Sequence, residues 1–294
     1  TRMKSDLPKV LHPIGGAPML VHAMRAGAAL DPEKTVIVAG HGAEAVRRAA
    51  LAYDPDAQIV LQNEQLGTAH AVAQAGPALD GFAGDALVLY GDTPFIRAET
   101  LAAMAQARAT HDIVVLGFEA ADAGRYGRLI MAGDALERIV EFKDATNEER
   151  SVSLCNSGVI AAKSSVLFDL IAAVDNDNAA GEYYLTDIIG IARAKGLSAT
   201  VVRCDEATAR AAAIADGVTL LAPQTVFFAY DTCIGRDAVI EQNVVFGPNV
   251  TVESGATIRA FSHLEGCHVS RGATVGPYAR LRPGAELQED VHIG

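Results

Sequence analysis

The chain has 294 residues, of which 50% are hydrophobic, and its 36 acidic and 24 basic side chains give a formal net charge of −12. A chain of this length is expected to form about two domains, and its acidic balance argues against nucleic acid as a partner. An anionic substrate would therefore need local lysines and arginines or a divalent cation. No apolar run reaches the length of a membrane span, and no signal peptide is visible.

Short apolar runs alternate with helical patterns through the first two-thirds of the chain. The predicted helices cover 18–30, 43–53, 68–78, 164–174 and 184–194, and the predicted strands cover 35–38, 58–61, 86–90, 113–118, 128–131, 138–142 and 158–162. Thr68 is the predicted N-cap of its helix. The alternation favours a mostly parallel sheet with helices on both faces, and ligands bind beyond the carboxyl ends of such strands. An alanine-rich helix at 209–215 is expected to link this region to the tail.

The tail carries a large apolar residue at nearly every sixth position. These residues are Ile234, Ile240, Phe246, Val252, Ile258, Leu264, Val269, Val275, Leu281, Leu287 and Ile293. A period of six is the hexapeptide signature of a parallel β-helix, whereas ordinary antiparallel strands have a period of two. The single five-residue step, from Leu264 to Val269, predicts a local slip in one coil.

The cysteines are few and widely spaced. Cys155, Cys204, Cys233 and Cys267 include no C-x-x-C pair, which argues against a zinc site or a disulfide framework. We therefore expect four buried free thiols in a reducing compartment.

Two polar segments could bind a nucleotide. Arg2 and Lys9, near the start of an acidic chain, would suit phosphate oxygens, although composition alone favours a solvated tail. Gln62 and Gln65 follow a predicted strand and could read the edge of a base, and Gly67 permits close backbone approach at a helix N-terminus. A polar loop before a capped helix is the alternative. His70 is expected to be a hydrogen-bonded structural residue rather than a base.

A carboxylate follows the most apolar strand. Asp92, in Tyr90-Gly91-Asp92-Thr93-Pro94, is placed to bind Mg²⁺, which takes one or two carboxylates together with substrate phosphates; a turn aspartate before proline is the alternative. Further polar clusters at 124–128, 141–144, 156–158 and 181–187 are individually typical of turns and caps. There is no P-loop, G-x-G-x-x-G, H-E-x-x-H or G-x-S-x-G motif.

Together these segments resemble a known family. Residues 1–9, Thr-Arg-Met-Lys-Ser-Asp-Leu-Pro-Lys, are similar to the end of the L-A-A-G-x-G-T-R-M…L-P-K signature of sugar-nucleotide pyrophosphorylases. The segments 62–70, 90–92, 126–128 and 181–187 follow in the family's order. With the hexapeptide tail and its 276–284 segment, the chain resembles the bacterial bifunctional N-acetylglucosamine-1-phosphate uridyltransferases/glucosamine-1-phosphate N-acetyltransferases over essentially its whole length.

The resemblance implies a fold and an assembly. It implies an α/β, Rossmann-like nucleotidyltransferase domain with a mostly parallel sheet over residues 1–208, a linker helix at 209–216, and a truncated left-handed parallel β-helix over 217–294, the acetyltransferase domain. It also implies a cytoplasmic homotrimer packed along the β-helix.

The same resemblance implies residue roles. Arg2 and Lys9 contact the phosphates of UTP and the pyrophosphate leaving group, Asp92 binds Mg²⁺, and Arg282 contacts glucosamine-1-phosphate. The remaining nucleotide- and sugar-binding residues are Gln62, Gly67, Thr68, Tyr90, Gly91, Gly127, Glu141, Asn156, Tyr184 and Thr186. The implied products are UDP-N-acetylglucosamine and pyrophosphate, and the full-length protein would also acetylate glucosamine-1-phosphate with acetyl-CoA, feeding peptidoglycan and lipopolysaccharide synthesis.

Three departures from the family pattern bear on these roles. The glycine-rich loop expected before Thr1 is absent, and so is a stretch between Thr208 and Ala209 with an asparagine that completes the metal site. The residues ending at Gly294 do not reach the acetyltransferase base histidine. Two alternatives stay open: another pyrophosphorylase with a hexapeptide tail, making ADP-glucose or GDP-mannose, and a non-catalytic nucleotide-sugar sensor.

Overall fold

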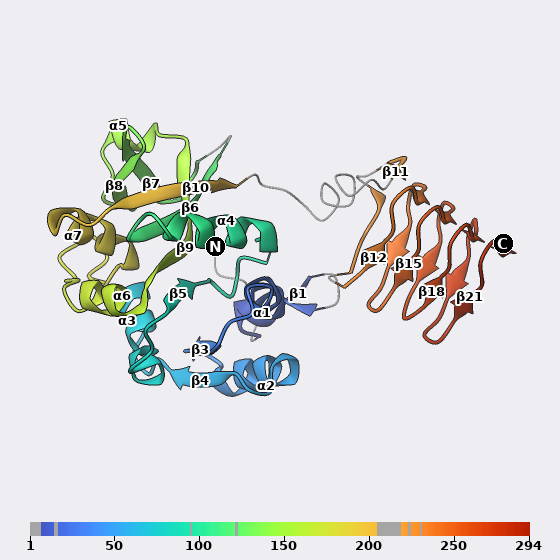
Figure 1. Ribbon diagram of the computed structural model, residues 1–294, viewed down its shortest axis with the longest axis horizontal. Helices are drawn as coiled ribbons and strands as arrows, with labels where there is room; N and C mark the ends of the chain where they lie inside the picture. The colour runs from blue at the N-terminus through green and yellow to red at the C-terminus, as the bar shows by residue number, and fades with distance from the viewer. Residues whose placement is uncertain are drawn as a thin grey trace. The chain divides into compact units, whose positions relative to one another are not determined.

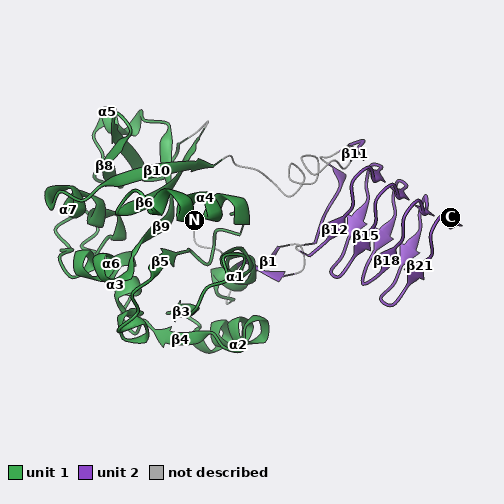
Figure 2. Ribbon diagram, viewed as in Figure 1, with its two compact units in different colours: residues 1–11, 20–206 green, residues 12–19, 207–294 purple. Residues whose placement is uncertain are grey.

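The computed structural model describes residues 7–14, 17–94, 96–120, 123–204, 219–222, 225–229 and 231–294. Its internal contacts divide the chain into unit 1, residues 1–11 and 20–206, and unit 2, residues 12–19 and 207–294 (Figure 2). The predicted linker helix at 209–216 lies outside the described residues. Within the described ranges, none of the helices combines the length and the hydropathy that crossing a membrane requires.

Helices and strands alternate through unit 1 (Figure 1). The helical elements are η1 (Lys9–Leu11), α1 (Met19–Ala28), α2 (Ala43–Tyr53), α3 (Thr68–Ala73), η2 (Gly76–Leu79), α4 (Ala98–Arg108), α5 (Asn147–Arg150), α6 (Ser164–Ile171), η3 (Leu185–Asp187) and α7 (Ile188–Ala194). The strands are β3 (Val36–Ala39), β4 (Gln58–Leu61), β5 (Asp85–Val88), β6 (Ile113–Glu119), β7 (Arg128–Ala132), β8 (Ala135–Val140), β9 (Leu154–Lys163) and β10 (Ala199–Cys204).

The main sheet has the order β10-β6-β9-β7-β8, with β5 also paired to β9. β10 and β6 are parallel, as are β3 and β4 in a separate two-stranded sheet, so the predicted α/β class is confirmed. β9 runs antiparallel to both β5 and β6. The predicted strand at 158–162 is only the second half of β9. The alternation of strands and helices did not reveal its reversed direction.

Helices cover both faces of β6, whose residues from Ile113 to Phe118 are all buried. Ile113 and Val115 belong to the core cluster that includes α6 and α7 residues such as Leu167 and Ile188. The intervening Val114 and Leu116 belong to the cluster with Leu101 and Met104 of α4. Successive side chains of a strand point to opposite faces, so a strand buried on both faces reads as a continuous apolar run.

Unit 2 contains a left-handed parallel β-helix built from two-residue strands (Figure 1). Its strands are β11 (Thr219–Leu220), β12 (Cys233–Ile234), β13 (Val239–Ile240), β14 (Val245–Phe246), β15 (Thr251–Val252), β16 (Thr257–Ile258), β17 (His263–Leu264), β18 (His268–Val269), β19 (Thr274–Val275), β20 (Arg280–Leu281), β21 (Glu286–Leu287) and β22 (His292–Ile293). They form three parallel sheets, β11-β13-β16-β19-β22, β12-β15-β18-β21 and β14-β17-β20. Residues 12–19, grouped with this unit by contacts, hold the antiparallel strands β1 (Pro13–Ile14) and β2 (Ala17–Pro18).

Each predicted hexapeptide residue from Ile234 to Ile293 is the second residue of a strand, which confirms the repeat. Most of these side chains are buried and form one core cluster. The predicted slip is also present. Thr251 pairs with His268 and Thr257 pairs with Thr274, both at an offset of 17 residues, whereas Cys233 pairs with Thr251 in the coil before at an offset of 18.

Several local predictions need correction. Thr68 is the first residue of α3 and caps nothing there; the N-cap is Gly67, with no side-chain hydrogen bond. The helix predicted to run to residue 78 ends at Ala73, because Pro77 disfavours its continuation. The chain forms the separate 3-10 helix η2 there. None of the four cysteines, all of which lie in the described part of the chain, forms a disulfide, but only Cys155 and Cys267 are buried, and Cys233 is exposed.

Candidate active site

Lys9 and Asp92 form an ion pair at the end of β5. Lys9 Nζ lies 2.6 Å from Asp92 Oδ2, and the two side chains are 60% and 32% exposed, so a ligand can reach both. Gly91 allows the loop after β5 to lie close to the N-terminal residues: a Cβ at this position would lie 3.2 Å from Val10 and 3.3 Å from Leu20. The resemblance implies a phosphate contact for Lys9 and a Mg²⁺ contact for Asp92, and the structure brings the two side chains into contact.

The loop of residues 62–68, which we call the base loop, follows β4 and opens α3. Gln62 Nε2 donates to the Gly67 carbonyl oxygen at 3.1 Å, and Gln65 Nε2 donates to the Gln62 carbonyl oxygen at 3.1 Å. Gly67 has φ +123°, and a Cβ there would lie 2.4 Å from the carbonyl oxygen of Tyr183. Only glycine fits this position, because the conformation and the close backbone both exclude a side chain.

Residues 183–186, which we call the strap, are hydrogen-bonded to the base loop and to the start of α3. Tyr183 N donates to Leu66 O at 2.8 Å, and Ala69 N donates to Tyr183 O at 2.9 Å. Leu185 N donates to Thr68 Oγ1 at 2.9 Å. The Thr68 hydroxyl, which was predicted to cap α3, therefore accepts a hydrogen bond from the strap instead.

The end of the strap reaches the predicted sugar-binding residues. Thr186 is buried, and its Oγ1 donates to Glu141 Oε1 at 3.3 Å. A Cβ at Gly127 would lie 3.5 Å from Glu141 Oε1 and 3.6 Å from Asn156 Cβ, and Asn156 N donates to Gly127 O at 2.9 Å. The structure thus brings together Gly127, Glu141, Asn156 and Thr186, which are dispersed in the sequence.

Tyr90 lies between the base loop and the residues around Glu141. Its ring rests on Gly158, where a Cβ would lie 2.6 Å from the ring, and its hydroxyl lies near the Thr68 side chain. Burial, with smaller contributions from the charges of Glu141 and Asp92, raises the pKa of Tyr90 to about 12. Tyr90 therefore stays a neutral phenol and connects the base loop to the residues around Glu141.

An acidic cavity of about 400 Å³ adjoins this region. Its lining includes Glu141, Asp144, Asp175, Tyr184 and Asp187. Burial is the main cause that raises the pKa of the Glu141 carboxyl, and the pKa of the Tyr184 hydroxyl is raised for the same reason. Burial together with the charges of Asp175, Glu141 and Asp144 raises the pKa of Asp187 to about 6.

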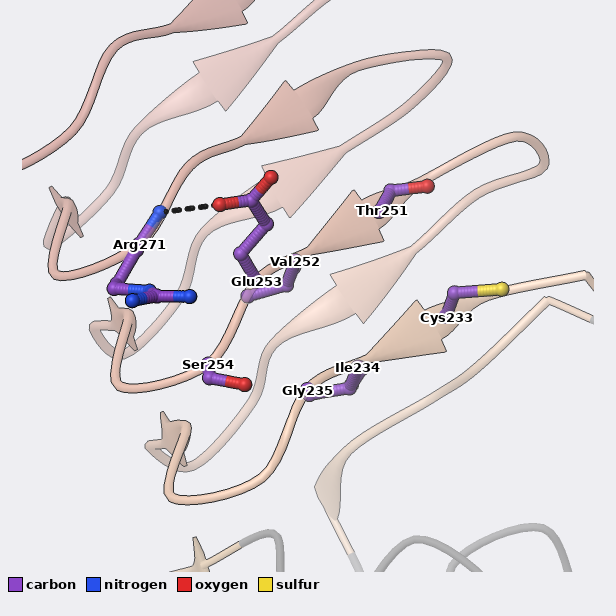
Figure 3. A pocket seen from close by; sticks show the side chains of 8 residues that line it. All are labelled: Cys233, Ile234, Gly235, Thr251, Val252, Glu253, Ser254 and Arg271. Carbon is purple, nitrogen blue, oxygen red and sulfur yellow. Dashed lines mark hydrogen bonds between the residues drawn. The ribbon is translucent and has the colours of Figure 1, made fainter.

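The two remaining charged residues of the prediction are Arg2 and Arg282. Arg2 lies outside the described residues. Arg282 belongs to unit 2, where it is exposed directly after β20. Unit 2 also has a shallow hollow of about 400 Å³ beside β12 and β15, drawn in Figure 3, where Arg271 N donates to Glu253 Oε2 at 2.9 Å.

The sequence prediction missed the contribution of the strap backbone. The cluster at 181–187 was noted for its polar side chains, whereas Tyr183 contributes through its main-chain N–H and carbonyl. Asp187 was also missed as a carboxylate facing the cavity with Glu141. Gly67 is different, because its residue type indicated a close backbone contact in advance. It has a positive φ in the structure.

Solved structures with the same fold include enzymes named as nucleotide transferases. An inositol-1-phosphate CTP transferase from T. maritima superposes with a TM-score of 0.55 at 17% identity, covering 70% of this chain and 80% of that one. A putative glucose-1-phosphate thymidylyltransferase from Bacillus anthracis superposes with a TM-score of 0.54 at 20% identity, covering 67% of this chain and 78% of that one. At these identities the likeness concerns the fold alone.

Sequence relatives identify the family. The family model of the MobA-like NTP transferase domain matches residues 1–177. The protein named Bifunctional protein GlmU from Ruegeria pomeroyi is 67% identical, and that from Roseobacter denitrificans is 62% identical; each match covers 100% of this chain and 70% of the relative. Both alignments run over 314 residues, 20 more than this chain contains, so the relatives have residues within the aligned region that the chain lacks. The chain therefore belongs to the bifunctional GlmU family of enzymes, in which a UDP-N-acetylglucosamine pyrophosphorylase, a sugar-phosphate nucleotidyltransferase, is joined to an acetyltransferase.

Proposed function

We propose that the chain transfers the uridylyl group of UTP to N-acetylglucosamine-1-phosphate in a Mg²⁺-dependent reaction that yields UDP-N-acetylglucosamine and pyrophosphate. The observation that carries this proposal is the contact between Lys9 and Asp92, 2.6 Å apart where β5 ends. A cation and a hard-oxygen donor in one exposed position suit a metal-bound triphosphate.

The residues present fit Mg²⁺ as a site of one protein carboxylate. Asp92 offers a partly exposed carboxylate, and the described residues contain no group of three or more His, Cys, Asp or Glu that could form a complete protein cage. Mg²⁺ commonly binds through one or two carboxylates and takes its remaining ligands from water and substrate phosphates. When bound, the ion would neutralise negative charge on the phosphates.

The chain's own residues supply positioning and charge. Lys9, together with Arg2 in our proposal, neutralises phosphate oxygens of UTP and of the leaving pyrophosphate. The phosphate of the sugar substrate is already anionic, so the reaction needs no general base. In our proposal Glu141 and Asn156 hydrogen-bond the sugar, and Tyr90 and the strap set the spacing between the sugar and base sites. The hydrogen bond from Thr186 in the strap to Glu141 supports this arrangement.

A nucleotide-specificity assay of the full-length protein tests the proposal. With N-acetylglucosamine-1-phosphate as the acceptor, we expect kcat/KM for UTP to exceed that for ATP and GTP. Activity with ATP or GTP above that with UTP would favour another NDP-sugar pyrophosphorylase. Nucleotide-sugar binding without any turnover would favour a sensor.

The proposal extends to the whole protein. We propose that unit 2, through Arg282, contributes to acetylation of glucosamine-1-phosphate by acetyl-CoA, and that the protein is a homotrimer assembled along its β-helix. The free cysteines are consistent with the cytoplasm, where the product would enter peptidoglycan and lipopolysaccharide synthesis. Sedimentation that detects only monomers of the full-length protein would contradict the trimer.

A further inference from the structure

His70 lies on α3 between two glutamine side chains. Gln62 Nε2 is 3.1 Å from His70 Nδ1, and Gln74 Nε2 is 3.3 Å from His70 Nε2. Gln62 follows β4, whereas Gln74 follows α3, one turn after His70. The mechanism proposed above gives His70 no part in the reaction, so these contacts need a separate explanation.

The hydrogen bonds of Gln62 determine which end of its carboxamide is left for a ligand. Gln62 Nε2 donates to Gly67 O, and because a carbonyl oxygen only accepts, the amide nitrogen must face it. A carboxamide nitrogen has two hydrogens. One is used by Gly67 O and the other by His70 Nδ1. Only the acceptor, Oε1, remains for recognition.

Gln62 Oε1 lies beside Gly40, the residue that follows β3. A Cβ at Gly40 would lie 3.7 Å from Gln62 Oε1 and 3.3 Å from Gln65 Nε2. The hydrogen bonds of the Gln62 side chain to described residues all involve Nε2. The missing side chain at Gly40 therefore leaves the acceptor open at the carboxyl ends of the parallel strands β3 and β4.

The orientation of Gln62 also fixes the proton on His70. A neutral imidazole has one acceptor nitrogen and one donor nitrogen. Because Gln62 presents an N–H to Nδ1, Nδ1 is the acceptor and Nε2 carries the proton. Gln74 Nε2 donates to the His70 carbonyl oxygen at 3.0 Å. In this tautomer the 3.3 Å contact between Gln74 Nε2 and His70 Nε2 joins two donors, so it is not a hydrogen bond.

We propose that His70 is a positioning residue that sets nucleobase selection through Gln62. By accepting the second amide hydrogen, His70 makes Gln62 a pure acceptor, which favours a pyrimidine whose ring N3 carries a hydrogen. Uracil has this N3–H, whereas N3 of cytosine is an acceptor and would face Oε1 without a hydrogen bond. The inference rests on the proposed binding of the base by Gln62 and explains how the choice between UTP and CTP is made.

Two substitutions of similar size separate the ring nitrogens. In His70→Asn the side-chain oxygen can take the place of Nδ1, whereas in His70→Gln the amide reaches the place of Nε2 and leaves the Nδ1 position without an acceptor. We expect the ratio of kcat/KM for UTP over CTP to stay near the wild-type value in His70→Asn and to fall about tenfold in His70→Gln, the size expected for one hydrogen bond. The KM for N-acetylglucosamine-1-phosphate should stay unchanged in both variants.

The measurement uses the full-length protein, with Gln74→Leu as the control that removes the second glutamine and leaves Nδ1 in place. An unchanged ratio in His70→Gln, or an equal loss in His70→Asn and His70→Gln, would overturn the role of His70 while leaving a wild-type preference for UTP intact. A wild-type enzyme that uses CTP as well as UTP would contradict the inference directly. A wild-type enzyme that prefers ATP or GTP would contradict the proposed function instead.

Discussion

The β-helix of unit 2 and the sheet of unit 1 relate sequence to structure in opposite ways. In the β-helix each strand pairs with the strand one coil later, so Val252 lies next to Val269 and the same residue type recurs on each face. In unit 1, β9 pairs with β5, β6 and β7, and the strap binds a loop that precedes it by more than a hundred residues. A repeat specifies its own contacts, whereas a sheet with long connections leaves them to tertiary packing.

The difference also separates stability from chemistry. The β-helix core consists mainly of aliphatic residues that recur at a fixed spacing. The candidate active site consists of single residues such as Lys9, Asp92 and Glu141, which are brought together from different elements. Substitutions in the two regions should therefore affect different measurements.

Replacing Asp92 should produce the largest effect and sharpen this separation. We expect Asp92→Ala to lower kcat of uridylyl transfer about a hundredfold or more, the scale for loss of one preorganised electrostatic group, while some sugar-nucleotide binding and the thermal unfolding midpoint are retained. Steady-state kinetics and calorimetry of the full-length protein measure the two quantities. The exposed Asp80→Ala removes the same charge elsewhere and should leave kcat unchanged. Unchanged turnover in Asp92→Ala would refute the proposed metal role.

Replacing Leu264 should show the opposite pattern. Leu264 is fully buried in the β-helix, so Leu264→Ala should cost about 3 kcal/mol of the free energy of unfolding of unit 2, with kcat for uridylyl transfer unchanged below the transition. Chemical denaturation followed by circular dichroism measures the loss. His263→Ala changes the exposed neighbour in the same strand and should cost little. An equal loss of uridylyl transfer would show that the two regions are not independent.

The sequence was sufficient for the fold wherever contacts repeat or stay local. The hexapeptide residues, including the short step to Val269, lie at the predicted places because each coil repeats the same three-sided path. The reversed direction of β9 was not predictable, since its polar residues Asn156 to Gly158 looked like a turn. They lie inside the strand, where Ser157 Oγ donates to Leu116 O across a register shift.

The site was predictable only in part, for a related reason. Asp92 was identified because it follows an apolar strand, and its contact with Lys9 agrees with that reasoning. The contacts of Tyr183 were not predictable, because they are made by main-chain atoms that every residue has. Thr68 was assigned to local capping, but Leu185, 117 residues later, competes for its hydroxyl and binds it.

A substitution at Gly67 tests whether the strap positions the site. Gly67→Ala places a Cβ 2.4 Å from Tyr183 O at a φ of +123°, so the strap must shift. We expect a loss of about 2 kcal/mol in the free energy of unfolding and a higher KM for both substrates. Gly81→Ala is a matched control, because Gly81 also has a positive φ, +69°, but nothing lies within 4 Å of its Cβ position. Equal effects in the two variants would assign the loss to backbone conformation rather than to the strap.

The smallest expected effect depends on pH and concerns the acidic cavity. Burial first, and then the charges of Asp175, Glu141 and Asp144, raise the pKa of Asp187 from its ordinary 3.8 to about 6. A raised pKa in the folded state means that ionised Asp187 opposes folding: its contribution to stability is fully present below the unfolded pKa of 3.8 and is lost as the pH rises through about 6. Asp187→Asn should therefore stabilise the protein at pH 7.5 and by much less at pH 4. The gain at pH 7.5 should be only about 1 kcal/mol, because solvent screens this half-buried carboxylate.

Asparagine is chosen because it is as favourable as aspartate at the start of α7. Thermal unfolding at the two pH values measures the difference, with the exposed Asp169→Asn as the control for charge removal. A gain in stability of Asp187→Asn that is the same at both pH values would mean that the pKa of Asp187 is not raised in the folded protein.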